Sequence, residues 1–134
     1  MSRPVFVDTF ALLAMLNTAD ARHEAAMRWF RVSTRPLVVN EWVLTELADA
    51  LCAVRTRQAA VAVERRMRSE RRVTVIESSA DLFGRGFDLY ANRPDQEWSL
   101  TDCISFVVMK DRHIKEALTG DHHFEQAGFV ALLK

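Results

Sequence analysis

Short apolar runs separated by long amphipathic stretches restrict this chain to few folds. Such runs are present at residues 5–7, 37–39, 73–76 and 129–132, and we expect a fifth strand at 114–118, which begins and ends on apolar residues. The stretches between them carry apolar residues at helical spacing, as at Val43, Leu47, Ala50 and Val54. Strands that alternate with helices form a parallel sheet covered on both faces. We therefore predict an α/β fold, a three-layer α/β/α sandwich with a central parallel sheet of about five strands.

Capping residues and breakers place the helices of this pattern. We expect a short helix over 10–16, a helix from Asp20 to about 33, one that begins at Asn40 and extends to about 54, and one over 57–71. Two further helices are expected after Ser78 or Ser79, up to about 91, and after Ser99, up to 111. The stretch 92–98 between them is predicted to be a loop.

Length and composition favour one ordinary folded domain over the whole chain. The 134 residues are 49% hydrophobic with a formal net charge of zero, enough apolar content for a real core. We interpret Cys52 and Cys103 as core residues of a protein in a reducing compartment, because one pair makes no disulfide framework. Residues 1–4 lead straight into the first strand, so we expect no signal peptide, no membrane segment and a cytoplasmic location.

Four acidic residues, far apart in the sequence, fall where a parallel sheet would bring them together. Asp8 and Asp121 closely follow predicted strands, while Glu46 and Asp102 lie in helical patterns. In an open α/β sheet the binding crevice lies outside the carboxyl ends of the strands. Carboxylates gathered there repel one another, and a hard divalent cation with oxygen ligands relieves that repulsion. The pattern therefore indicates a metal-dependent hydrolase.

Each acid also has a purely structural interpretation. Asp8 and Asp121 are able to cap the helices that follow them, and Asp102 stands three residues after Ser99, as in a capping box. Glu46 is harder to explain in this way, because it lies beside the apolar face of its helix with no basic residue three or four positions away. Both interpretations stay open at this point.

The motifs around these acids resemble those of the PIN-domain family, and more closely the VapC-type toxins of bacterial toxin–antitoxin pairs. They are Val-Asp-Thr at 7–9, Val-Leu-Thr-Glu at 43–46, Ser-Leu-Thr-Asp-Cys-Ile-Ser-Phe at 99–106 and Leu-Thr-Gly-Asp-His-His-Phe at 118–124. The resemblance covers nearly the whole chain, as a single PIN-like nuclease domain over 1–134. It implies Mg²⁺- or Mn²⁺-dependent endonucleolytic cleavage of single-stranded or structured RNA, a cognate antitoxin and a homodimer.

The same resemblance implies roles for particular residues. Asp8, Glu46, Asp102 and Asp121 match the metal-binding and catalytic acids of the family. Thr9 matches the hydroxyl residue that follows the first acid, and Asp95 matches an additional acid found upstream of the third motif. In such a site divalent ions polarise the scissile phosphate and lower the pKa of a bound water. His122 and His123 lack the partner ligands of a zinc site, so we expect them to fill the first turn after Asp121, with one of them near the substrate.

Positive charge is concentrated in one segment. Residues 55–72 hold seven arginines against two glutamates, a net charge of +5 in a neutral chain. Arg65, Arg68 and Arg72 have the spacing of one helix face, which would suit RNA phosphates. A solvated helix face, or a surface for an acidic antitoxin segment, explains the pattern equally well.

Two other classes of protein share parts of this pattern. A receiver-like phosphoacceptor domain shares the doubly wound sheet, but it needs clustered acids at the first strand and a late lysine, and Asp8 stands alone there. A catalytically silent PIN-like binding module is the second alternative. The intact set of four acids argues against it.

Overall fold

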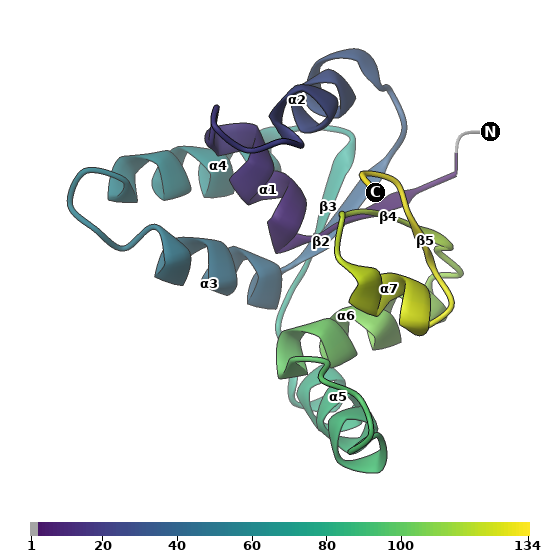
Figure 1. The fold of residues 1–134 in the computed structure, drawn as a ribbon. Coiled ribbons are helices and arrows are strands. Elements are labelled where there is room, and N and C mark those ends of the chain that lie inside the picture. Colours follow the sequence, from purple (N-terminus) through teal and green to yellow (C-terminus); the bar gives the residue numbers. More distant parts are fainter. Residues whose placement is uncertain (1–2) are drawn as a thin grey trace.

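The computed structural model describes residues 3–134 and contains a five-stranded sheet between two layers of helices (Figure 1). The strands are β1 (Val5–Val7), β2 (Leu37–Asn40), β3 (Val73–Ile76), β4 (Glu116–Leu118) and β5 (Val130–Ala131). The helices are α1 (Thr9–Leu16), α2 (His23–Val32), α3 (Glu41–Ala50), α4 (Arg57–Ser69), α5 (Ala80–Asn92), α6 (Leu100–Asp111) and α7 (His122–Gln126). All neighbouring strands pair in parallel, in the order β3-β2-β1-β4-β5. The predicted fold class is confirmed.

The strand order explains how the layers form. The chain moves outward from β1 to β2 and β3, then returns to β4 on the other side of β1. Right-handed crossovers therefore place α1 to α4 on one face and α5 to α7 on the other (Figure 1). The central strand β1 is fully buried, as a strand with helices over both faces must be.

The direction reverses between β1 and β4, and this is the topological switch point where open α/β sheets bind ligands. Asp8 directly follows β1, and Thr119 directly follows β4. Gly120 comes next, and a Cβ atom there would lie 2.6 Å from the ring of Phe10. Only glycine lets the chain after β4 pass this close to α1, which brings Asp121 beside the end of β1.

Most capping predictions are confirmed. Asn40 accepts a hydrogen bond from the backbone of Val43, and Ser79 accepts one from Leu82. Ser99 and Asp102 form a complete capping box at the start of α6. Asp20, by contrast, does not begin a helix. Its carboxylate accepts from the backbone of Arg22 in a turn before α2.

Helix and strand ends differ in several places. α3 ends at Ala50, so Cys52 lies in the following turn and is exposed, which makes its assignment to the core wrong. Cys103 is buried, as expected. α4 ends at Ser69, two residues short of the predicted end. Residue His113 has a positive φ of 56°, and the turn it makes delays β4 until Glu116.

Within residues 3–134 no helix is both long and apolar enough to cross a lipid bilayer. Met1 and Ser2, on which the expectation about a signal peptide partly rests, lie outside the described residues.

Candidate metal centre

Asp8 is the most deeply buried of the four acids, with 5% of its surface exposed. It occupies the N-cap position of α1, yet its side chain accepts no capping hydrogen bond from that helix. Instead one carboxylate oxygen accepts from the hydroxyl of Thr119 at 2.8 Å. Burial raises the pKa of Asp8 to about 7, against the lowering effect of the Thr119 hydrogen bond. The capping interpretation therefore fails for this residue.

Glu46 faces the same region from α3. The hydroxyl of Thr9 donates to its Oε1 at 2.6 Å, which links the residue after Asp8 to the second acid. Burial raises the pKa of Glu46, and the nearby charges of Asp102 and Asp121 raise it further. The sequence showed no partner for Glu46 on its own helix, and the structure supplies one from α1, the hydroxyl of Thr9.

Asp102 combines the two interpretations of its sequence position. Its Oδ2 accepts from the backbone N–H of Ser99 at 3.1 Å, which closes the capping box. The carboxyl is nevertheless largely buried, and burial raises its pKa, with the charge of Asp121 adding to the rise. The capping hydrogen bond thus fixes the orientation of the Asp102 side chain, and the carboxylate still lies near enough to Asp121 to interact with its charge.

Asp121 caps α7 by accepting from the backbone N–H of His123 at 2.9 Å. Its own backbone N–H donates to the hydroxyl of Thr119 at 3.0 Å. Since the same hydroxyl donates to Asp8, Thr119 ties the first and the fourth acid together from a fully buried position. The pairing of β1 with β4 sets the distance between the two strand ends, and the Thr119 hydroxyl links the two acids that follow them.

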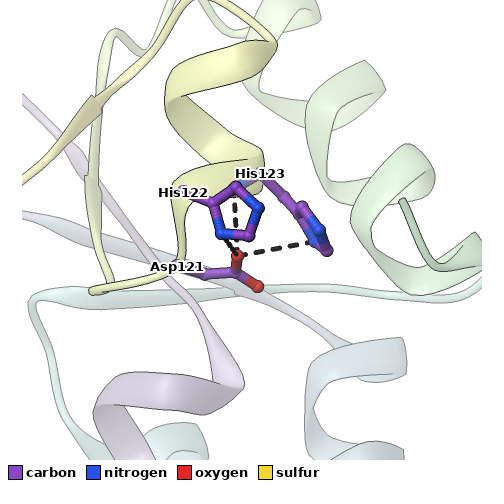
Figure 2. A group of neighbouring side chains, drawn as sticks. All are labelled: Asp121, His122 and His123. Atoms are coloured by element: carbon purple, nitrogen blue, oxygen red, sulfur yellow. Dashed lines mark hydrogen bonds and ion pairs between the residues drawn. The ribbon is translucent and has the colours of Figure 1, made fainter. Parts of the chain in front are cut away.

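Two histidines complete the cluster. Figure 2 shows the carboxylate of Asp121 facing the rings of His122 and His123, and ligand atoms of these three residues all lie within 4.8 Å of one another. The Nδ1 atom of His123 lies 3.2 Å from Asp102 and 3.4 Å from Asp121. His123 thus lies in the first turn of α7, as expected, and its ring bridges the carboxylates of Asp102 and Asp121.

Within residues 3–134 the four acids form no ion pair with arginine or lysine, and histidine rings are their sole ionic partners. Burial raises the pKa of buried Asp8 and of partly buried Glu46 and Asp102, and such carboxyls favour a nearby positive charge. Their oxygen donors are the kind that Mg²⁺ and Mn²⁺ prefer. The group of ligand atoms that lies within 4.8 Å among the described residues is Asp121, His122 and His123, and the set of four acids stays a predicted ligand set.

The other residues singled out in the sequence fall outside this cluster, apart from Thr9. Asp95 lies exposed in the loop after α5, where Arg93 binds it through two hydrogen bonds of 3.0 Å and lowers its pKa. Its possible place in the metal site finds no support in these contacts.

The predicted arginine stripe is not one helix face. Arg65 and Arg68 lie on α4, but Arg72 lies beyond its end and donates to the backbone carbonyls of Phe30 and Ser33. Arg68 is held by Glu64 and Glu41. The prediction of a shared face is wrong for Arg72, because α4 ends early. A role in RNA binding stays a prediction for all three.

Thr119 is the site residue that sequence reasoning gave no role, and the contact of His123 with Asp102 is the detail that it did not predict. Thr119 immediately precedes Gly120-Asp121, and a buried hydroxyl after a strand end is a signal that was available in the sequence. The contact of His123 with Asp102 joins residues 21 positions apart, and no local pattern predicts it.

Comparison with known proteins agrees with this geometry. The family model of the PIN domain matches residues 5–130, and the chain belongs to the PIN-domain family. Membership of this family contradicts the receiver-like alternative. The relatives described next are endonucleases, which supports the interpretation of the chain as a nuclease.

The chain is similar to the 23S rRNA-specific endonuclease VapC20 of Mycobacterium tuberculosis. The two are 33% identical over 129 residues, which cover 94% of this chain and 95% of the relative. The crystal structure of VapC20, described as a Sarcin-Ricin loop cleaving toxin, superimposes with a TM-score of 0.86. That match covers 96% of this chain and 98% of the other, at 31% identity.

Proposed function

We propose that the chain, as one nuclease domain over 1–134, is a metal-dependent endoribonuclease and the toxin of a toxin–antitoxin pair. The observation that carries the proposal is the set of four carboxylates at the switch point of the sheet, which have no arginine or lysine partner within residues 3–134. A buried anionic cluster of this kind is destabilising in itself, so it is retained for a cation. The related endonuclease VapC20 supports RNA as the substrate.

Asp8, Glu46, Asp102 and Asp121 would hold the Mg²⁺ or Mn²⁺. When bound, the cation supplies charge stabilisation for a phosphodiester and lowers the pKa of a coordinated water. The surrounding residues do the positioning: Thr9 orients Glu46 with a hydrogen bond of 2.6 Å, and Thr119 orients Asp8 with one of 2.8 Å. His123 is placed to exchange a proton near Asp102 and Asp121.

The antitoxin is proposed as the second partner, and its surface lies away from the acids. An apolar hollow of about 310 Å³ opens between α1, α2 and α4, lined among others by Met27, Phe30 and Met67. Arg31, Arg66 and Arg72 also line it. An amphipathic segment would fit this surface, because its apolar side chains fill the hollow. Glu70 also lines the hollow and pairs with Arg66 and Arg72, so Arg31 is the arginine that an acidic flank of the segment would meet.

Cleavage assays test the enzymatic part. Purified protein is expected to cut RNA that contains a sarcin–ricin-type loop in the presence of Mg²⁺ or Mn²⁺, and EDTA is expected to stop the reaction. Asp102→Asn retains the capping geometry with a neutral side chain, so it should lose cleavage while remaining folded. Unchanged cleavage in EDTA would contradict the proposal, and a folded wild-type protein that never cleaves would support the catalytically silent alternative.

A further inference from the structure

An arginine precedes each of three neighbouring strands at the same register. The first residues of β1, β2 and β3 are paired with one another in parallel. The arginines that stand two positions before these residues are named here the arginine row: Arg3, Arg35 and Arg71. Figure 1 shows β1 running from the marked N-terminus towards the start of α1, so the row and the acids lie at opposite ends of the sheet.

Hydrogen bonds between the strands hold the row in register. The first residue of β1 donates its backbone N–H to the carbonyl of Pro36, and the first residue of β2 donates to that of Arg72, each at 2.9 Å. The Nε atom of Arg35 also donates to the carbonyl of Arg3 at 2.9 Å. Because neighbouring strands lie about 4.8 Å apart, the three arginines start from backbone positions that are close together and regularly spaced.

The charge of the row is only partly compensated. Glu116 is shared by two arginines, since its carboxylate lies 2.5 Å from Arg35 and 3.8 Å from Arg3. The side chain of Arg3 is 78% exposed. Arg71 is exposed and makes no hydrogen bond or ion pair within residues 3–134. Lys115, also exposed, precedes β4 on the other side of β1, so these four cations outnumber the one carboxylate by three.

Helix ends do not account for the whole row. Cations are favourable near the C-terminus of a helix because of the macrodipole, and Arg71 follows the end of α4 by two residues. Arg35 follows the end of α2 by three residues, but its guanidinium is turned to Glu116. Arg3 follows no helix among the described residues. The shared register of the three arginines therefore calls for another explanation.

We propose that the arginine row binds the phosphate backbone of the RNA substrate at a distance from the bond that is cut. This inference rests on the proposed function and adds a second contact surface to it. Arg3 stands five residues before Asp8, which is about 17 Å of extended strand. The two ends of the sheet therefore contact different nucleotides. A folded RNA would rest on the row while its loop reaches the acids.

The chemistry of the row favours RNA over an acidic protein segment. Phosphates recur at every nucleotide, and the fork of each guanidinium matches a phosphate with two parallel hydrogen bonds. A protein segment gains most of its affinity from apolar side chains, with charges at the rim of the contact. The apolar hollow between α1, α2 and α4 offers such contacts, and none of the three arginines of the row lines it.

A contact at each end of the sheet would let the protein select large folded RNA. Binding at one end raises the effective concentration of the RNA at the other, so an RNA that spans both ends gains affinity from both. An RNA that reaches the acids alone meets only the acidic end of a protein without net charge. The row would therefore matter for a long RNA and not for a short one.

Binding of two RNAs to a double variant tests the proposal. Arg3→Gln combined with Arg71→Gln removes both ends of the row and keeps Arg35, which holds Glu116. The probes are a sarcin–ricin-type loop on a long duplex stem and the same loop alone, with all proteins on the Asp102→Asn background. For the long RNA, Kd should rise about tenfold and the magnitude of the salt slope should fall by about 1.5, because two phosphate contacts are lost. Binding of the loop alone should not change.

A matched variant controls for the loss of charge. Arg55→Gln combined with Arg57→Gln removes two exposed cations at the turn between α3 and α4, which Figure 1 shows at the end of these helices far from the sheet. This control should change Kd for the long RNA less than twofold, and circular dichroism should show that both double variants are folded. With Asp102 restored, the variant of the row should raise KM for the long RNA and leave kcat unchanged.

The proposal is overturned if the variant of the row and its control change Kd for the long RNA equally, or if the loop alone loses as much affinity as the long RNA. Unchanged RNA binding with a loss of binding to a poly-glutamate peptide would assign the row to an acidic protein segment instead. A wild-type protein that binds the long RNA through the row but cleaves neither RNA would contradict the proposed function alone, so the two failures are distinguishable.

Discussion

The acids at the end of the sheet and the arginines of segment 55–72 differ in their exposure to solvent and in their ion pairs. Asp8 is buried and the other three acids are partly buried, and no arginine or lysine among the described residues forms an ion pair with them. The arginines are mostly exposed and several are paired, as Arg66 is with Glu70 and Arg68 with Glu64. Charge count alone would have ranked the arginine segment first as a binding site. Burial without a compensating charge is the better indicator, because surface pairs cost little to keep.

The largest expected effect follows from neutralising the most buried acid. Asp8→Asn keeps the shape of the side chain but removes its charge, so metal-dependent RNA cleavage should fall by a factor of about 100 or more. Asp49→Asn removes an exposed acid from the helix that carries Glu46 and should leave the rate within about twofold. Single-turnover cleavage rates measure both. Equal cleavage rates for the two variants would contradict a special role of Asp8 in catalysis.

The second prediction concerns pH and the metal-free protein. Burial raises the pKa of Asp8 from its ordinary value of 3.8 to about 7 in the folded protein, so between these values the folded state binds a proton that the unfolded state has released. Stability is therefore highest below the lower value and falls as the pH rises towards 7. Burial shifts Glu46 and Asp102 in the same direction.

Denaturant unfolding in EDTA at several pH values measures this loss. Asp8→Asn should flatten the slope and be more stable than the wild type near neutral pH. Saturating Mn²⁺ should raise the Tm of the wild type at pH 7 more than that of the variant. A wild-type stability that increases from pH 4 to pH 7 without metal would contradict the electrostatic description of the site.

The third prediction separates a structural arginine from a solvated one. Arg72 is 17% exposed in its side chain and donates to the carbonyls of Phe30 and Ser33, which anchors the end of α2. Arg72→Gln should cost about 1–3 kcal/mol of unfolding free energy, because buried acceptors lose their donor. Arg71→Gln, its exposed neighbour, should cost less than about 0.5 kcal/mol. If Arg72→Gln and Arg71→Gln lowered the free energy of unfolding equally, Arg72 would have no structural role beyond that of an exposed arginine.

Much of this architecture could be predicted from local pattern. The apolar runs set the strands, and Asn40, Ser79 and Ser99 set helix starts that the structure confirms. Strand order puts Asp8 and Asp121 at one edge, so proximity of the acids followed from topology. The strands and helix starts are predictable because each depends on residues close together in the chain, and the meeting of Asp8 and Asp121 is predictable because parallel strands share one carboxyl edge.

The remainder depends on contacts between distant residues. The hydrogen bond from Thr119 to Asp8 spans 111 positions, and Thr9 reaches Glu46 across 37. Arg72 was placed on a helix face because helical spacing continues in the sequence, whereas its bonds to Phe30 and Ser33 hold it outside α4. Such pairings are set by tertiary packing, which a periodicity does not encode.

The smallest expected effect lies within the arginine segment itself and compares two arginines of α4. Arg65 is exposed and makes no hydrogen bond or ion pair among residues 3–134, whereas Arg68 is held by Glu64 and Glu41 at 2.5 and 2.6 Å. If this helix meets RNA, the uncommitted guanidinium contributes more, because it releases counterions without first leaving acidic partners.

Arg65→Gln should therefore weaken RNA binding a few-fold and lower the magnitude of the salt slope by about one. Arg68→Gln should do so less, since its charge is already compensated by two carboxylates. Binding measured on a cleavage-deficient Asp102→Asn background, at several salt concentrations, separates affinity from chemistry. A larger effect from Arg68 than from Arg65 would mean that RNA displaces its acidic partners. No change from either would make this face of α4 a solvated surface, and positive charge for RNA would have to come from another element.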